Sequence, residues 1–175
     1  MAQQSVPRTP QNLAVGVITG THGVSGWLKV RSYSDETDHL VALHEALFRK
    51  GAVERLLPIE AVRPMPRGIL LKLRGMDAPE RARSLVGFEI WVPRPQAAQL
   101  LDDEYYVADL CGCSVWFGER EVGSVRSVWD GGPSQLLEVL SPEGKTSLVP
   151  FTDHFVGEVD VGKGRIFLRE DEVLR

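Results

Sequence analysis

Short apolar stretches separated by glycine- and proline-rich turns dominate the first half of the chain. One of them, Trp27–Tyr33, places Leu28 and Val30 on one face and polar or aromatic side chains on the other, as a half-buried strand does. Another, Gly68–Leu73, is apolar almost throughout, which predicts a strand buried on both faces. The strands expected in this half are Leu13–Ile18, Trp27–Tyr33, Leu56–Val62, Gly68–Leu73 and Phe88–Val92.

One short helix is expected in the same half, starting near Asp77. Asp77 can cap the first free amides, Pro79 is tolerated in the first turn, and Glu80 stands three residues after the cap. Gly87 is a suitable residue to end this helix. The pattern of Leu40–Phe48 fits a helical turn and a strand equally well, so both remain open.

A glycine-rich segment, Gly20–Gly26, joins the first two expected strands. It lacks the lysine of a phosphate-binding loop, and its match to a Gly-x-x-Gly nucleic-acid clamp, Gly23–Gly26, lies between strands instead of helices. A hairpin whose glycines adopt positive φ is the simpler interpretation. The two interpretations are compatible, because Thr21 and His22 at an exposed turn could still contact a backbone phosphate.

Six short strands at roughly ten-residue spacing, with a turn signal between each pair, are expected in the second half. They are Cys113–Phe117, Glu121–Trp129, Gln135–Leu140, Lys145–Pro150, Val156–Val161 and Arg165–Leu168. Such spacing predicts a small closed barrel, since closure removes exposed strand edges. The chain is therefore expected to be mainly β, with two small β-barrels at residues 12–93 and 104–175. Residues 1–11 are expected to form a flexible tail and residues 94–103 a linker.

A run of three acids leads into two adjacent tyrosines where the second half begins, Asp102-Asp103-Glu104-Tyr105-Tyr106. In a strand, neighbouring side chains point to opposite faces, so one tyrosine would enter a core and the other would be exposed. An exposed tyrosine beside acids suits a basic protein partner, because tyrosine is favoured at binding hot spots. We therefore expect a protein-binding site at Tyr105 and Tyr106.

The charge of the chain is divided between its halves. Residues 1–100 carry 13 Lys and Arg against 9 Asp and Glu, a balance of +4, whereas residues 101–175 carry 7 against 15, a balance of −8. A basic half suits a nucleic-acid surface, to which Lys29 and Arg31 could add phosphate contacts, and an acidic half suits a basic partner. Ordinary variation in surface charge is the alternative explanation.

Composition narrows the class of protein further. The 43% hydrophobic and 25% charged residues are typical of a soluble globular protein, and no apolar run approaches the ~18 residues of a membrane helix. No secretory signal is visible, and Cys111 and Cys113 are too close together for a disulfide to constrain much. We expect a reduced, cytoplasmic protein without metal or cofactor.

Catalysis finds little support among the four histidines, which are His22, His39, His44 and His154. None has zinc-type spacing, and no serine nucleophile elbow is present. Asp153 and His154 could be the orienter and base of a hydrolase, although adjacent residues rarely face each other and a solvated loop histidine is the commoner case. We expect no enzyme; a small RNA-processing hydrolase using His22 or His154 is the alternative.

Two segments together resemble the family of the bacterial ribosome maturation factor RimM. The first is Val15–Val30, which contains Thr19-Gly20-Thr21-His22-Gly23-Val24-Ser25-Gly26, and the second is Tyr105–Cys113 with its paired tyrosines and Asp-Leu. Shorter matches follow along the second half, at Gly123-Ser124-Val125, Leu148-Val149-Pro150-Phe151, Val159-Asp160 and Arg165–Leu168. Cys111 departs from the pattern by replacing a usual aliphatic residue with another small hydrophobe.

The resemblance implies a translation-factor-like N-terminal barrel of six strands and a C-terminal PRC-type barrel. It implies a non-enzymatic assembly factor that binds the immature small ribosomal subunit near its head, contacts ribosomal protein nineteen of that subunit, and assists 16S rRNA maturation. Tyr105 and Tyr106 would bind the protein partner; Thr21, His22, Gly23, Lys29 and Arg31 are the candidates for RNA or partner contact. A monomer is expected. A membrane-associated adaptor is a third hypothesis, because PRC barrels also occur in photosynthetic reaction centres, but the chain shows no membrane segment.

Overall fold

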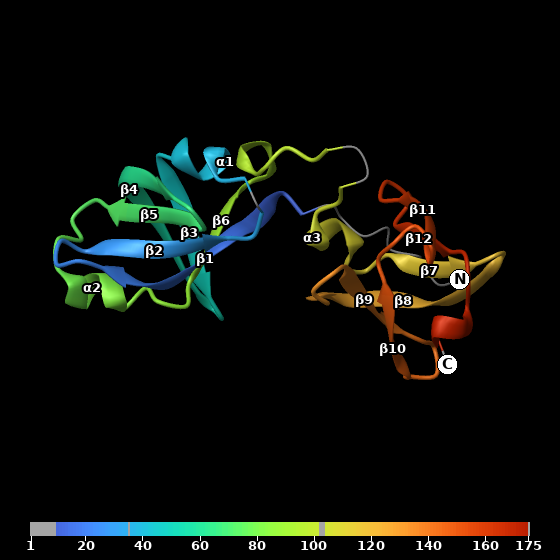
Figure 1. The fold of residues 1–175 in the computed structure, drawn as a ribbon. Coiled ribbons are helices and arrows are strands. Elements are labelled where there is room, and N and C mark those ends of the chain that lie inside the picture. Colours follow the sequence, from blue (N-terminus) through green and yellow to red (C-terminus); the bar gives the residue numbers. More distant parts are fainter. Residues whose placement is uncertain (1–9, 35, 102–103, 175) are drawn as a thin grey trace. The chain divides into compact units, whose positions relative to one another are not determined.

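Six antiparallel strands close the first half of the chain into a barrel, in the order β1-β2-β5-β4-β3-β6 (Figure 1). The structure is a computed structural model that describes residues 10–34, 36–101 and 104–174. Most of the expected tail, and Asp102 and Asp103 of the acidic run, lie outside the described residues. The barrel strands are β1 (Asn12–His22), β2 (Trp27–Ser32), β3 (Glu45–Lys50), β4 (Val53–Met65), β5 (Gly68–Leu73) and β6 (Glu89–Pro93).

Alternating side chains fill the barrel, whose largest fully buried residues include Ile18, Phe48 and Ile90. β5 is buried along its entire length, which confirms the prediction from its continuous apolar sequence. β1 pairs with both β2 and β6, and its register shifts between Ile18 and Gly20 and again between Ala14 and Gly16. Such bulges bend a strand, so β1 can turn the corner that closes the barrel.

Two strands of the first half end later than expected, and the structure decides one stretch that the sequence left open. β1 continues to His22, so the turn to β2 is only four residues long. β4 continues to Met65, beyond the expected strand end at Val62, and therefore includes Arg63. The undecided stretch Leu40–Phe48 contains both alternatives, because α1 (Asp38–Val41) ends inside it and β3 starts at Glu45.

The helix expected after Asp77 is present as α2 (Pro79–Arg83), but Asp77 does not cap it. The N-cap residue is Ala78, which makes no side-chain cap, and the Asp77 carboxylate instead accepts a hydrogen bond from Lys72. The helix ends before Gly87, whose φ of 85° turns the chain into β6. With α1 and the short 3-10 helix η1 (Arg94–Gln96), this half has more helical turns than the one helix expected.

The second half forms a six-stranded sheet in the order β10-β9-β8-β7-β12-β11. Its elements are α3 (Val107–Leu110), β7 (Ser114–Phe117), β8 (Arg120–Asp130), β9 (Gln135–Leu140), β10 (Thr146–Pro150), β11 (Val156–Asp160), β12 (Arg165–Leu168) and the 3-10 helix η2 (Glu172–Leu174). β7 and β12 pair in parallel, while the other neighbours are antiparallel. Among the described residues no pairing joins β10 to β11, so these are the end strands of the sheet.

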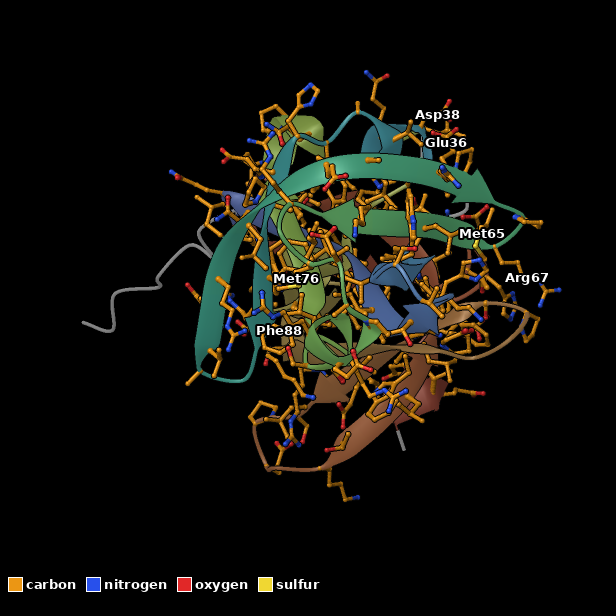
Figure 2. The ribbon with its side chains drawn as sticks, turned by 90° about the vertical axis from the view of Figure 1, so that its left-hand side faces the viewer. Glu36, Asp38, Met65, Arg67, Met76 and Phe88 are labelled. Carbon is orange, nitrogen blue, oxygen red and sulfur yellow. The ribbon has the colours of Figure 1, made fainter. Side chains whose placement is uncertain are left out.

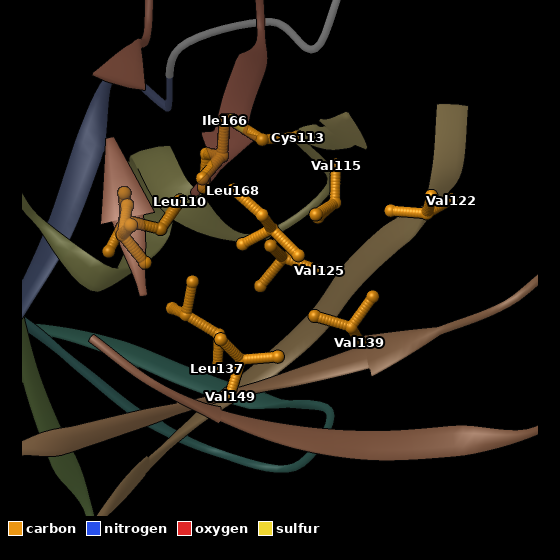
Figure 3. Close-up of a cluster of buried hydrophobic side chains, with 11 residues drawn as sticks. Leu110, Cys113, Val115, Val122, Val125, Leu137, Val139, Val149, Ile166 and Leu168 are labelled. Atoms are coloured by element: carbon orange, nitrogen blue, oxygen red, sulfur yellow. The ribbon is translucent and has the colours of Figure 1, made fainter. Parts of the chain in front are cut away.

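A cluster of small and medium apolar side chains forms the core of this second unit (Figure 3). It is made of Leu110, Cys113, Val115, Val122, Val125, Leu137, Val139, Val149, Val156, Ile166 and Leu168. Partly buried rings, among them Tyr105 and Phe151, pack against it. The curled sheet and α3 therefore share one core.

The chain divides into two compact units, with Gln11–Gln99 in the first and the residues from Leu100 onward in the second. Residues 94–99, expected within a linker, belong to the first unit. There Ala97 is buried, and the Arg94 amide donates to the carbonyl of Gln11. The proline-bearing stretch after β6 is thus attached to the barrel.

Candidate functional site

The glycine-rich segment forms the tip of the β1–β2 hairpin, as the simpler interpretation predicted. His22 pairs with Trp27 on the outer face of the barrel, whereas Thr21 pairs with Leu28 on the inner face and is half-buried. Gly23 follows with a φ of 64°, and Val24 is 83% exposed. The structure therefore separates Thr21 from His22, which the sequence had grouped at one exposed turn.

A buried lysine holds this tip in position. Lys72 on β5 is 5% exposed, and its Nζ donates to the carbonyl of Ser25, to the carbonyl of Met76 at 2.8 Å, and to Asp77 Oδ1 at 2.8 Å. Gly26 has a φ of 72°, and a Cβ at this position would lie 2.0 Å from the Met76 oxygen. Only glycine allows such a close approach, so the hairpin tip and the β5–α2 loop are locked together.

Cationic and aromatic side chains cover the outer face of β2 and its neighbours. Lys29 and Arg31 are exposed there, as expected. Arg63 of β4 joins them, with its guanidinium carbon 4.5 Å from the centroid of the Trp27 ring. Sequence reasoning did not identify Arg63 as part of this surface. Its contact with Trp27 depends on the register of β4 against β5, in which Arg63 pairs with Leu70.

A second aromatic group is formed by Tyr33, directly after β2, Trp91 on β6 and Arg49 on β3. The Tyr33 hydroxyl donates to Glu89 Oε1 at 2.8 Å, and Trp91 Nε1 donates to Glu89 Oε2 at 3.3 Å. Burial, followed by the hydrogen bond and the negative charge of Glu89, raises the pKa of Tyr33 to about 12. The guanidinium of Arg49 lies over the Trp91 ring at 4.4 Å and pairs with Glu54 at 2.5 Å.

The paired tyrosines lie immediately before α3 and not in a strand, so the expected in-and-out alternation is wrong. Both side chains are half-buried. Tyr105 packs edge-to-face on Phe151, with ring centroids 5.9 Å apart, and against the core of the second unit. The carbonyl of Tyr106 accepts hydrogen bonds from the amides of Asp109 and Leu110, which starts α3. Tyr105 therefore packs the start of this segment on the core, and the backbone of Tyr106 begins α3.

The two cysteines are free thiols placed near the same helix. Cys113 is buried, and its Sγ donates to the Asp109 carbonyl at 3.1 Å. Burial raises the pKa of both thiols, which keeps them protonated and poorly nucleophilic. Cys113 is a core residue, half-buried Cys111 lies two residues before it, and neither thiol is activated as a nucleophile.

The surroundings of the two candidate catalytic histidines, His22 and His154, give little support for catalysis. His154 is exposed, lies edge-to-face on Phe155, and has Glu170 Oε1 at 3.8 Å, so Glu170 and not Asp153 is the acid beside it. His22 lies beside Trp27 on the outer face of the barrel. Within the described residues no group of three or more His, Cys, Asp or Glu side chains is arranged to hold a metal ion.

A shallow hollow of about 700 Å³ lies between α1 and residues 95–99 of the first unit. His39 contributes to its wall, and burial lowers the pKa of this histidine. None of the helices in the described parts of the chain is long and apolar enough to cross a bilayer.

Both units of the chain match domains of known proteins. Residues 13–97 match the RimM N-terminal domain, and residues 107–173 match the RimM PRC barrel domain. The chain belongs to the RimM family. The family resemblance expected from the hairpin and tyrosine motifs is thereby confirmed, as is a mainly β fold with a closed six-stranded barrel and a PRC barrel.

Individual relatives match over most of their length. A protein from Treponema pallidum named ribosome maturation factor RimM is 40% identical over 169 residues, which cover 90% of this chain and 97% of the relative. One of the same name from Paracoccus denitrificans is 34% identical, covering 89% and 93%. A crystal structure of a 16S ribosomal RNA processing protein RimM from Pseudomonas aeruginosa is 26% identical, with a TM-score of 0.46, covering 91% of this chain and 98% of that one.

Proposed function

We propose that this protein is a ribosome maturation factor that binds the precursor of the small ribosomal subunit in the cytoplasm and assists maturation of 16S rRNA without catalysing a reaction. The observation that carries this proposal is the match of both units, in order, to the two domains of the RimM family. Relatives that this chain covers almost completely are named ribosome maturation factors. The exposed setting of His22 and His154 agrees with a binding protein.

The second unit would supply the contact to a basic ribosomal protein, for which we propose protein nineteen of the small subunit, in the head region. Residues 101–175 carry a net charge of −8, which steers a basic partner toward this unit. Tyr105 and Tyr106 are both half-buried, so part of each ring remains accessible at the start of α3. The exposed side chain of Glu104 directly precedes them.

The first barrel would supply contacts to ribosomal RNA through His22, Gly23, Lys29 and Arg31. The two cations are exposed on β2, and the hairpin tip is held rigid next to them by Lys72. Phosphate contacts of this kind position a protein on its RNA and weaken as salt increases. Thr21, on the inner face, would contribute to the shape of the tip and not to direct contact.

The tyrosine pair provides the test. Tyr106→Ala is expected to weaken co-sedimentation with precursor small subunits about tenfold while the second unit stays folded, as loss of a tyrosine hot spot does. Tyr105→Ala is expected to lower the melting temperature as well, because it removes the ring that packs on Phe151. Tyr105→Phe keeps that ring and serves as the matched control. A folded Tyr105→Ala/Tyr106→Ala protein that still co-sediments normally would contradict the proposed role of the pair.

A further inference from the structure

Two arginine–tryptophan stacks lie on the outside of the first barrel, and their electrostatic surroundings differ. In the first, Arg49 lies 4.4 Å above Trp91, and carboxylates engage both partners: Glu54 pairs with the guanidinium and Glu89 accepts from the indole. In the second, Arg63 lies 4.5 Å from Trp27. Within residues 10–34, 36–101 and 104–174, no carboxylate lies within ion-pair distance of Arg63. We call the Arg63–Trp27 pair the open stack.

Further cations lie next to the open stack. Lys29 and Arg63 flank Leu70 in one row across β2, β5 and β4, and Leu70 is 9% exposed beneath them. Opposite Lys29 stands Gly20, where a Cβ would meet no atom within 4 Å, so the row continues onto open surface. Arg31 follows two residues along the same face, and it too makes no ion pair among the described residues.

The β4–β5 turn extends this cationic surface. Arg67 is exposed at the turn and points away from the barrel (Figure 2). The next residue, Gly68, has a φ of 119°, and a Cβ there would lie 3.3 Å from the Cα of Arg31. The β4–β5 turn, which carries Arg67, therefore lies directly against the end of β2 that carries Arg31.

We propose that the open stack binds unpaired ribonucleotides, with a base on the free side of the Arg63 guanidinium and the adjoining phosphates on Lys29 and Arg31. An arginine plane held by an aromatic ring is preorganised for stacking, and bases stack on arginine and aromatic side chains in single-stranded RNA recognition. Arg63, Lys29 and Arg31 have no ion-pair partner within the described parts of the chain, so their positive charge favours the phosphates, whereas Glu54 and Glu89 already engage the stack at Trp91. This inference rests on the proposed function, which makes ribosomal RNA the available partner.

The test compares the two stacks in the full-length protein. The probe is a fluorescein-labelled single-stranded RNA of about 12 nucleotides, within the site size of small β-barrels, and fluorescence anisotropy gives its affinity. Arg63→Ala is expected to weaken binding about tenfold, the effect of losing one stacked base. Arg49→Ala, the matched control, is expected to change it less than about twofold. Arg63→Lys keeps the charge but not the plane, so it should bind nearly as weakly as Arg63→Ala.

The contribution of the two cations, Lys29 and Arg31, can be measured separately through the salt dependence of RNA binding. Lys29→Ala/Arg31→Ala is expected to reduce the slope of log affinity against log salt by about 1.4, since each single-strand phosphate contact contributes about 0.7. Equal binding of the Arg63→Ala and Arg49→Ala proteins would overturn the inference. So would an Arg63→Lys protein that binds like wild type, because charge alone would then suffice.

Association with precursor small subunits, measured on the same proteins, separates this inference from the proposed function. Wild type that does not co-sediment with the subunits would defeat the proposed function, while Arg63-dependent binding to the RNA probe would still support the open stack. Normal co-sedimentation of wild type, with equal probe binding by the two arginine variants, would defeat the inference alone. Loss of subunit association in Arg63→Ala without loss of probe binding would assign this surface to an acidic protein and overturn the inference.

Discussion

The hairpin tip around Gly26 and the segment around Tyr105 carry the two motifs of the family resemblance, and different forces hold them. At the tip, a buried ammonium donates to three oxygens from two loops. At the tyrosines, the Tyr105 ring packs edge-to-face on Phe151 and against an apolar core, and the Tyr106 carbonyl accepts from two backbone amides of α3. Directional polar contacts therefore fix the first motif, and apolar packing fixes the second.

This difference determines how each motif should respond to change. A buried ammonium is stabilising only while its acceptors stay in place, because an unpaired charge in a protein interior is costly. An aromatic contact tolerates small displacements, since packing is less directional than hydrogen bonding. The hairpin tip should therefore be sensitive to single atoms, whereas the tyrosine segment should depend on the total apolar area that it buries.

The largest expected effect comes from Gly26→Ala, which attacks the polar arrangement directly. The new Cβ would lie 2.0 Å from the Met76 oxygen at a residue whose φ is 72°, so the loop must move away from Lys72. The first barrel is expected to lose roughly 3–5 kcal/mol, from left-handed strain together with overpacking. Hydrogen exchange read peptide by peptide should show faster exchange in the first unit and unchanged exchange in the second.

Gly23→Ala is the matched control for this prediction. Gly23 has a similar φ of 64°, but its Cβ would meet nothing within 4 Å. Only the left-handed strain applies, so a cost of about 1–2 kcal/mol is expected. Equal costs for the two variants would show that close approach to Met76 does not matter, and that the tip is not locked to the neighbouring loop.

A smaller effect is expected from Lys72→Met, which keeps the apolar stem and removes the ammonium. The carbonyls of Ser25 and Met76 lose their donor, which should cost about 2–3 kcal/mol. Urea denaturation of the full chain would measure this cost. Asp77→Asn is the control, because the Asp77 side chain is 79% exposed and an ion pair so placed contributes under about 1 kcal/mol. If Asp77→Asn were as costly as Lys72→Met, the ion pair and not the carbonyl contacts would hold the tip.

Local sequence signals predicted the parts of this structure that depend on neighbouring residues. The glycines gave the hairpin, and the continuous apolar run gave the fully buried β5. The prediction failed where a residue outside the helix competes for a side chain. Asp77 has the spacing of a helix cap, but Lys72 takes its carboxylate and Ala78 becomes the N-cap residue. A lysine inside a strand predicted to be buried was the available signal that an acceptor must lie nearby.

The candidate surfaces depend still more on tertiary register. The open stack exists because β4 continues through two prolines and brings Arg63 beside Leu70, one strand away from β2. Local sequence gives no information on that pairing, so the strand was expected to end at Val62, before Arg63. The tyrosines show the same limit, since their alternation assumed a strand, and the chain starts a helix at that point. Residue types alone indicated the chemistry of these surfaces, whereas finding which residues lie next to one another required the fold.

The smallest expected effect is a loss of stability of the first barrel at alkaline pH, which acts through the polar contact between Tyr33 and Glu89. The hydroxyl of Tyr33 is bonded to Glu89, and its pKa in the folded protein is about 12, above the ordinary value of 10.0. The folded state therefore favours the neutral phenol, so the stabilisation is complete below pH ~10 and is lost as the pH rises toward ~12. Because Tyr33 is 49% exposed, solvent screening should limit the loss to under about 1 kcal/mol. Urea midpoints of wild type and Tyr33→Phe, compared at pH ~9 and ~11, should converge as the pH rises. A constant difference between the two proteins across this range would mean that ionisation of Tyr33 does not weaken the barrel.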